Sequence, residues 1–118
     1  SAGVNTAARE TVEQLCTELR NRLDYPWTLD EIVRRSGSSA PHLHRLFGQV
    51  TSLSPCRWLR RERVYAAAGL LSTTDKTMVE IAVDVGLEGR SQLHRAFREA
   101  MGLSPDQYRR RRRGGGRG

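Results

Sequence analysis

The chain has 118 residues, of which 37% are hydrophobic and only 6% aromatic, enough for one modest helical core or for two very small units on a shared support. No apolar run approaches the roughly 18 residues of a membrane span, and the N-terminal residues lack a signal peptide's apolar stretch, so we expect a soluble, cytoplasmic domain without membrane contact. The net charge of +7 comes mostly from the C-terminus, because residues 109–117 hold six of the twenty Lys and Arg side chains.

The other charges are unevenly distributed along the chain. Between Arg34 and Arg63 there are seven arginines and one acidic residue, whereas residues 10–31 contain six acids and two arginines. We therefore expect one basic and one acidic region of the surface. That arrangement suits a protein that presents one side to a polyanion such as a nucleic acid.

Residue types that carry catalysis or bind metals do not form a recognisable pattern. Cys16 and Cys56 each fall on an apolar helix face, which indicates reduced core thiols rather than a disulfide. A zinc site formed by His42, His44 and Cys56 is disfavoured, because residues two apart on a helix diverge and the sequence has no CxxC-type or HxxxH-type pair. With no GxSxG, P-loop or Ser/His/Asp constellation, the sequence predicts no enzyme, no metal and no cofactor.

An internal repeat dominates the sequence. The segments Leu43–Phe47 and Leu53–Pro55 recur fifty residues later as Leu93–Phe97 and Leu103–Pro105, and eight of the eighteen positions from 43 to 60 are identical at that offset. A repeat of this length indicates one supersecondary unit that is used twice.

Two amphipathic helices are predicted outside the repeated motif. One runs from Thr6 to about Leu23, with apolar residues at the i, i+3, i+4, i+7 spacing of one helical face. Ser54 and Pro55 open the other, a linker helix to about Leu71 that spans roughly 25 Å. The predicted inward positions are Val12, Leu15, Cys16, Leu19 and Leu23 in the first helix and Leu59, Ala66, Ala67, Leu70 and Leu71 in the second.

The first copy of the repeat has the signals of a helix-turn-helix, at about residues 28–50. Thr28–Glu31 has the capping-box form and starts a short helix, which ends where Gly37 can adopt the left-handed conformation of a tight turn. Ser39 caps the second helix, from Ala40 to about Gln49, and Pro41 stands in its first turn. The predicted inward side chains are Leu29, Ile32, Val33, Leu43, Leu46, Phe47 and Val50.

The second copy, at about residues 77–100, repeats this plan. Thr77–Glu80 has the capping-box form again, Gly86 takes the place of Gly37, and a helix follows from about Arg90 to Ala100. The predicted inward residues of its first helix are Ile81, Ala82 and Val85.

The two ends of the chain are predicted separately. Ser104 and Pro105 start a final helix, at about residues 105–112. The Arg/Gly stretch 113–118 has no means of burying apolar surface and is predicted to be disordered. Residues 1–5 are interpreted as a linker or a remnant of expression.

The outward residues of the two second helices suit double-stranded DNA, because a major groove about 12 Å wide admits one helix and exposes base edges to it. Arginine can pair with guanine and glutamine with adenine. The base-reading candidates are Pro41, His42, His44, Arg45, Arg90, Ser91, Gln92, His94 and Arg95. The candidates for contact with the DNA backbone are Ser39, Arg57, Arg60, Arg61, Thr77, Arg109 and Arg110.

The order of motifs in the second copy closely resembles the signature of the AraC/XylS family of bacterial transcription regulators. The matching residues are Ile81, Ala82, Val85, Gly86, Leu93, Arg95, Phe97, Gly102, Leu103, Ser104, Pro105, Tyr108 and Arg109. Leu87 and Leu93 depart from the pattern, since the family usually has phenylalanine at both positions. The resemblance covers about residues 6–110.

The resemblance implies an all-α, homeodomain-like domain of seven helices, at about residues 6–112, with two helix-turn-helix units joined by the linker helix. It implies promoter binding by two recognition helices in successive major grooves, and contact with RNA polymerase, in the bacterial cytoplasm at the nucleoid. It also implies a monomeric isolated domain and a full-length protein that dimerises through a separate N-terminal sensor domain.

One alternative from another class remains open at this stage. The Arg/Gly tail resembles segments that bind RNA, so the chain could be an RNA-binding or protein-interaction module that acts through its tail.

Overall fold

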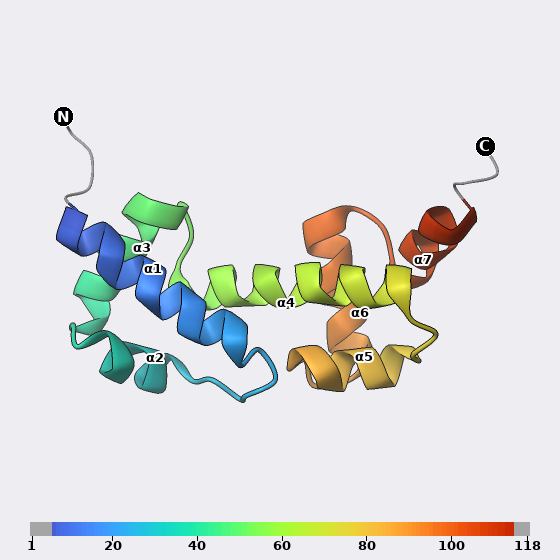
Figure 1. Ribbon diagram of the computed structural model, residues 1–118, viewed down its shortest axis with the longest axis horizontal. Helices are drawn as coiled ribbons and strands as arrows, with labels where there is room; N and C mark the ends of the chain where they lie inside the picture. Colours follow the sequence, from blue (N-terminus) through green and yellow to red (C-terminus); the bar gives the residue numbers. More distant parts are fainter. Residues whose placement is uncertain (1–5, 115–118) are drawn as a thin grey trace. The chain divides into compact units, whose positions relative to one another are not determined.

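The structure, a computed structural model, describes residues 6–114, which form seven α-helices and no strand (Figure 1). The helices are α1 (Thr6–Asn21), α2 (Leu29–Ser36), α3 (Ala40–Thr51), α4 (Pro55–Thr73), α5 (Met78–Val85), α6 (Arg90–Met101) and α7 (Pro105–Gly114). The predicted all-α fold with seven helices is confirmed. None of these helices is long and apolar enough to cross a membrane.

The chain divides into two compact units. Unit 1 ends at Leu59 and unit 2 begins at Arg60, so α4 gives its first residues to unit 1 and the remainder to unit 2. Each unit has its own hydrophobic core and contains one copy of the repeated motif.

In unit 1, α1 packs against both α2 and α3 (Figure 1). Phe47 of α3 is fully buried and meets Trp58 of α4 edge-on, with ring centroids 6.0 Å apart. Edge-on aromatic pairs add about 0.5 to 1.5 kcal/mol to the burial of the rings. The core consists of Val12, Leu15, Cys16, Leu19, Ile32, Leu43, Leu46, Phe47, Trp58 and Leu59.

Unit 2 reproduces this packing fifty residues later. Phe97 of α6 is fully buried and meets Tyr108 of α7 edge-on at 5.3 Å, as Phe47 meets Trp58. Leu87 and Leu93 are both buried, so the leucines fill the positions where phenylalanine is usual. The core consists of Val64, Ala67, Ala68, Leu71, Ile81, Ala82, Val85, Leu87, Leu93, Ala96 and Phe97.

The buried face of α4 differs from the prediction in its first turns. Trp58, Val64 and Ala68 are buried although they were not predicted to be, whereas Ala66 and Leu70 are half-buried. The prediction of a buried Cys56 is wrong, because Pro55, Trp58 and Leu59 follow the i, i+3, i+4 spacing inward and leave the residue after Pro55 exposed. Cys16 is buried, and both thiols are free, as expected.

The two predicted capping boxes have different outcomes. At the start of α5, Thr77 accepts from the Glu80 N–H and Glu80 accepts from the Thr77 N–H, so the box is confirmed. At the start of α2, Thr28 accepts from the Glu31 N–H, but the Glu31 carboxylate accepts instead from the Tyr25 hydroxyl at 2.5 Å. This hydrogen bond raises the pKa of Tyr25. The box at Thr28 is therefore only half formed among the described residues.

The last helix is longer than predicted. α7 continues to Gly114, and Arg113 donates to Asp75 at 2.6 Å and to the Thr74 carbonyl. The Arg113 guanidinium lowers the pKa of Asp75. The prediction of disorder is therefore wrong for Arg113 and Gly114, and both the rest of the predicted tail and the predicted N-terminal linker, residues 1–5, lie outside the described residues.

The two second helices end in the same backbone conformation with different residues. α3 ends at Ser52, with φ +67°, and α6 ends at the equivalent Gly102, with φ +79°. Among residues 6–114, Ser52 is the only residue other than glycine with positive φ. A left-handed residue with a Cβ costs about 1 to 2 kcal/mol, so the unit 1 copy contains a strained cap that unit 2 avoids.

We predict that Ser52→Gly raises the free energy of unfolding of unit 1 by about 0.5 to 1 kcal/mol, since glycine removes the strain but adds freedom to the unfolded chain. Urea unfolding followed by tryptophan fluorescence measures this directly, because Trp27 and Trp58 both belong to unit 1.

The reverse change, Gly102→Ser, is the matched control for unit 2. A Cβ on Gly102 meets no atom within 4 Å, so the expected loss of about 1 kcal/mol comes from the backbone alone. Circular dichroism during unfolding detects it. If Ser52→Gly instead lowers the free energy of unfolding, the explanation that Ser52 is a strained cap is contradicted.

Candidate nucleic-acid interface

The candidate DNA-reading face of unit 1 is the exposed side of α3. The Ser39 hydroxyl caps this helix by accepting from the His42 N–H at 3.2 Å. While Leu43, Leu46 and Phe47 are buried, the remaining side chains of the first turns point outward. The exposed residues are Pro41, His42, His44 and Arg45.

Hydrogen bonds on α3 fix the chemistry of its two imidazoles. Arg45 Nη2 lies 2.9 Å from His42 Nδ1 and donates to it, because a guanidinium nitrogen can only donate. His44 Nδ1 lies 3.1 Å from the Ala40 carbonyl and donates to it, because a carbonyl oxygen can only accept. Consequently α3 presents a guanidinium held in place by one imidazole, next to a second imidazole of fixed orientation.

The candidate DNA-reading face of unit 2 is the exposed side of α6, whose N-terminus is built differently. Gly89 precedes the helix with φ +135° and provides no side-chain cap. Instead Gln92 is half-buried, and its Oε1 accepts from the Glu88 N–H at 2.7 Å. A glutamine that pairs with adenine uses both its amide oxygen and its amide nitrogen, so in that pairing the Gln92 Oε1 would have to accept from adenine with its second lone pair or give up the bond to Glu88.

The other base-reading candidates on α6 are exposed: Arg90, Ser91, His94 and Arg95. The guanidinium of Arg90 lies 4.0 Å from the Asp106 carboxylate of α7. Arg95 has no hydrogen bond or ion pair with any residue between 6 and 114, so it differs from its equivalent Arg45, which His42 holds.

The arginines of α4 that were predicted to contact the DNA backbone have different surroundings. Arg57 is exposed. Arg60 is paired with Glu99 of α6 at 2.5 Å, and Arg61 lies over the Tyr65 ring with its Nε buried. Among these three, Arg57 is therefore the side chain that a phosphate could reach without displacing another contact.

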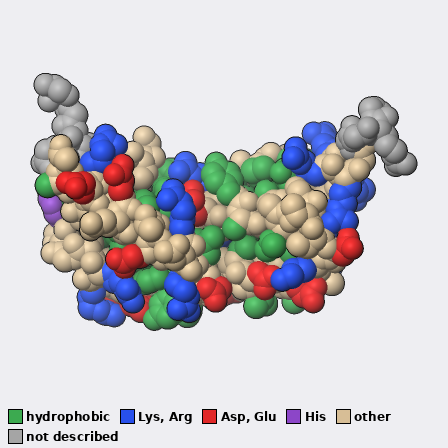
Figure 2. Space-filling model, viewed as in Figure 1, with side chains coloured by type: hydrophobic (Ala, Val, Ile, Leu, Met, Phe, Trp, Pro, Cys, Tyr) green, Lys and Arg blue, Asp and Glu red, His purple; other side chains and the backbone are tan. Residues whose placement is uncertain are grey.

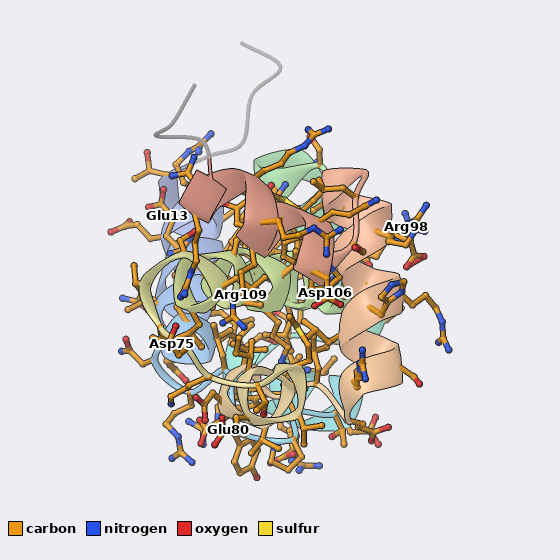
Figure 3. All side chains as sticks on the ribbon, turned by 90° about the vertical axis from the view of Figure 1, so that its right-hand side faces the viewer. Glu13, Asp75, Glu80, Arg98, Asp106 and Arg109 are labelled. Carbon is orange, nitrogen blue, oxygen red and sulfur yellow. The ribbon has the colours of Figure 1, made fainter. Side chains whose placement is uncertain are left out.

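Arg109 has a structural role that the sequence did not suggest. Its Nε donates to the Leu71 carbonyl at 3.2 Å and its Nη2 to the Thr74 carbonyl at 3.0 Å. In Figure 3 the side chain points inward from α7, whereas Arg98 points outward. Arg109 thus satisfies carbonyls at the C-terminus of α4, and its predicted contact with the DNA backbone would have to compete with these two hydrogen bonds. Arg110, the next residue, is exposed.

Thr77, the remaining candidate for contact with the backbone, caps α5. Its hydroxyl and its N–H are both used in the capping box with Glu80. Beside it, Lys76 donates to Asp84 at 2.5 Å, which raises the pKa of Lys76. Because these groups of Thr77 are in use, a phosphate beside Thr77 would be attracted by the positive N-terminus of α5.

A hollow lies on the surface of each unit. The hollow of unit 1 is about 370 Å³ and mixes charges, since Arg35 pairs with Glu18 at 3.2 Å and Arg22 with Asp24 at 3.5 Å. The hollow of unit 2 is about 380 Å³ and includes Arg98 and Arg111, two residues that the sequence analysis did not select. Arg98 follows Arg95 at the i+3 spacing of one helix side, which is the signal that could have identified it.

Within residues 6–114 no three His, Cys, Asp or Glu side chains gather as a metal site. The candidate ligands His42, His44 and Cys56 therefore do not come together.

Comparison with known proteins gives a consistent picture. Residues 32–111 match a family described as a helix-turn-helix domain. The chain is 29% identical over 103 residues to the regulatory protein SoxS of Salmonella typhimurium, an alignment that covers 87% of this chain and 96% of SoxS.

Two solved structures share the fold and more than a quarter of the sequence. The DNA-binding domain of AdpA, a global transcriptional factor in complex with a target DNA, superposes with a TM-score of 0.82 and 28% identity over 87% of this chain and 95% of that one. The C-terminal domain of AraT, a response regulator from Geobacillus stearothermophilus, superposes with a TM-score of 0.79 and 31% sequence identity. The match covers 85% of this chain and 84% of the AraT domain chain. The chain belongs to the AraC-type helix-turn-helix family, whose members are DNA-binding transcription regulators and not enzymes.

Proposed function

We propose that this chain reads promoter DNA with α3 and α6, which enter successive major grooves about 34 Å apart. The observation that carries the proposal is the repeated pair His44/Arg45 and His94/Arg95, which is exposed on each helix while the phenylalanine that follows it is fully buried. The AdpA domain, which shares this fold and was solved with a target DNA, supports DNA as the ligand.

In this proposal the two arginines make the main base contacts. A guanidinium can donate two parallel hydrogen bonds to the O6 and N7 atoms of guanine. His42 restricts Arg45 before DNA binds, which lowers the entropy lost on binding. Arg95 lacks such a partner among the described residues and orders only on DNA. The further base-reading residues are Pro41, His42, His44, Arg90, Ser91, Gln92 and His94.

Contacts with phosphates would position both helices. Ser39 and Thr77 stand at the N-termini of α3 and α5, where free amides and the helix dipole favour an anion. Arg57 and Arg110 are exposed and add charge. Arg60 and Arg61 can join them if DNA displaces the contact of Arg60 with Glu99, an exposed ion pair worth about 0 to 1 kcal/mol.

Regulation by this domain would include contact with RNA polymerase at the promoter, in the bacterial cytoplasm at the nucleoid. The domain itself, residues 6–114, would bind as a monomer whose two motifs replace the two subunits of a dimeric helix-turn-helix protein. Dimerisation of the full-length protein would then depend on a separate N-terminal sensor domain.

We predict that Arg95→Ala weakens specific DNA binding by about 1 to 3 kcal/mol and relaxes the preference at one base pair, because it removes a base contact and no contact within the protein. Fluorescence anisotropy with a cognate duplex gives the affinity, and selection from a random pool gives the preferred bases.

Arg9→Ala is the control, since it removes the same charge from an exposed position of α1. It should leave the preferred bases unchanged. If Arg95→Ala also leaves every base preference unchanged, Arg95 is not a base-reading residue.

Arg109→Ala should have the opposite effect. We predict a loss of about 1 to 3 kcal/mol in the free energy of unfolding of unit 2, because the Leu71 carbonyl of α4 and the Thr74 carbonyl just after it lose a charged donor. The base preferences should stay as in the unchanged protein. Urea unfolding followed by circular dichroism, together with site selection, tests both parts, and an altered preference with unchanged stability would contradict the structural role.

A further inference from the structure

The hollow of unit 2 lies at the end of α6 and beside α7. Its volume of about 380 Å³ exceeds the roughly 30 Å³ share of one water many times, so it can hold an anion with part of its hydration. No acidic side chain lines it. The lining residues are Arg98, Gly102, Leu103, Gln107, Arg110 and Arg111. We refer to Arg98, Gln107, Arg110 and Arg111 as the arginine cradle.

The acids nearest in sequence to the cradle are paired with other arginines. Glu99, which follows Arg98, pairs with Arg60 at 2.5 Å. Asp106, which precedes Gln107, faces Arg90 at 4.0 Å. The cradle is thus left without a compensating carboxylate from its own helices.

The three arginines of the cradle carry positive charge that the described part of the chain does not neutralise. Arg98, Arg110 and Arg111 make no hydrogen bond or ion pair of their side chains within residues 6–114. The hollow of unit 1 differs, because acids compensate two of its arginines. Figure 2 shows Lys and Arg side chains gathered over α7. Three like charges around one hollow repel one another and attract a polyanion.

The donors of the cradle match phosphate oxygens. Each guanidinium offers a planar fork of N–H groups that fits two oxygens of one phosphate. Gln107 uses its Oε1 to accept from the Ser104 N–H at 2.9 Å, so its amide N–H groups remain as donors toward the hollow. An oxyanion is therefore the ligand class that this lining selects.

The place of Arg98 on α6 connects the cradle to DNA. Arg98 lies on the same side of the helix as Arg95, about 4.5 Å further along the axis toward the C-terminus. When the N-terminal half of α6 occupies a major groove, the C-terminal half meets the edge of that groove. Phosphates form this edge.

We propose that the arginine cradle binds a backbone phosphate beside the groove that α6 reads. The inference rests on the proposed function, and it extends the DNA contact from α6 to α7. The cradle supplies affinity that depends on salt and carries no base preference, whereas Arg95 supplies the preference.

The test compares the triple variant Arg98→Gln, Arg110→Gln, Arg111→Gln with a control that removes equal charge from unit 1, Arg9→Gln, Arg22→Gln, Arg35→Gln. Anisotropy with a selected duplex over a series of KCl concentrations gives the slope of log affinity against log salt. The cradle variant should lower the slope by about 1 to 2 and bind about 10-fold more weakly at low salt, with the same base preferences. The control should keep the slope of the unchanged protein.

Neutral methylphosphonate groups, placed singly along the duplex, locate the contact. The unchanged protein should lose about 3- to 10-fold in affinity at one or two adjacent positions beside the block that α6 reads. The cradle variant should be insensitive at these positions, because the arginines that would contact those phosphates have already been replaced. Equal sensitivity of both proteins at every position would overturn the proposal.

Three results separate the possible failures. If the unchanged protein selects no DNA sequence at all, the proposed function fails and the cradle proposal with it. If it selects sequences and the cradle variant keeps the full salt slope, the cradle proposal alone is overturned. Calorimetry with inorganic pyrophosphate tests for a free anion as the ligand. If pyrophosphate binds with a submillimolar Kd while the cradle variant and the unchanged protein have the same salt slope for DNA binding, the cradle is a site for a free anion. That result would also overturn the DNA assignment.

Discussion

The orientation of each reading helix depends on one buried phenylalanine. Phe47 and Phe97 are fully buried, and each meets the edge of an aromatic ring eleven residues later in the chain, Trp58 or Tyr108. Burial of such a side chain contributes about 1.5 to 3 kcal/mol, and the ring pair adds to it. Because successive residues of a helix are separated by about 100°, a shift of one residue would turn the arginine two positions before each phenylalanine away from DNA.

The periodic features of the sequence were sufficient to predict the seven helices, the repeat and most of the buried positions outside α4. Contacts between distant residues were not predictable in this way. Arg109 looks like one member of a charge run, yet its guanidinium binds carbonyls that lie 35 and 38 residues earlier. Tyr25 competes with Thr28 for Glu31, which a local capping rule does not include. Cys56 is exposed because the buried face of α4 includes its neighbour Pro55 instead, a difference of one position. Periodicity is least certain in the first turn of a helix.

The two units use one plan with different local chemistry. In unit 1 the arginine of the reading helix is held by His42, and Ser39 caps that helix. In unit 2 the helix starts without a side-chain cap, Gln92 is occupied by the Glu88 backbone, and the unpaired arginines of the cradle lie near its far end. We infer that unit 1 contributes a pre-ordered base contact, whereas unit 2 contributes more of the salt-dependent affinity.

The central claim is that both copies of the repeat read DNA at the same time. Selection of bound duplexes from a random pool by residues 6–114 tests it most directly. We expect two blocks of base preference whose centres are about 10 to 10.5 base pairs apart, as for two helices in successive major grooves. A single short block, or two blocks with variable spacing, would contradict it.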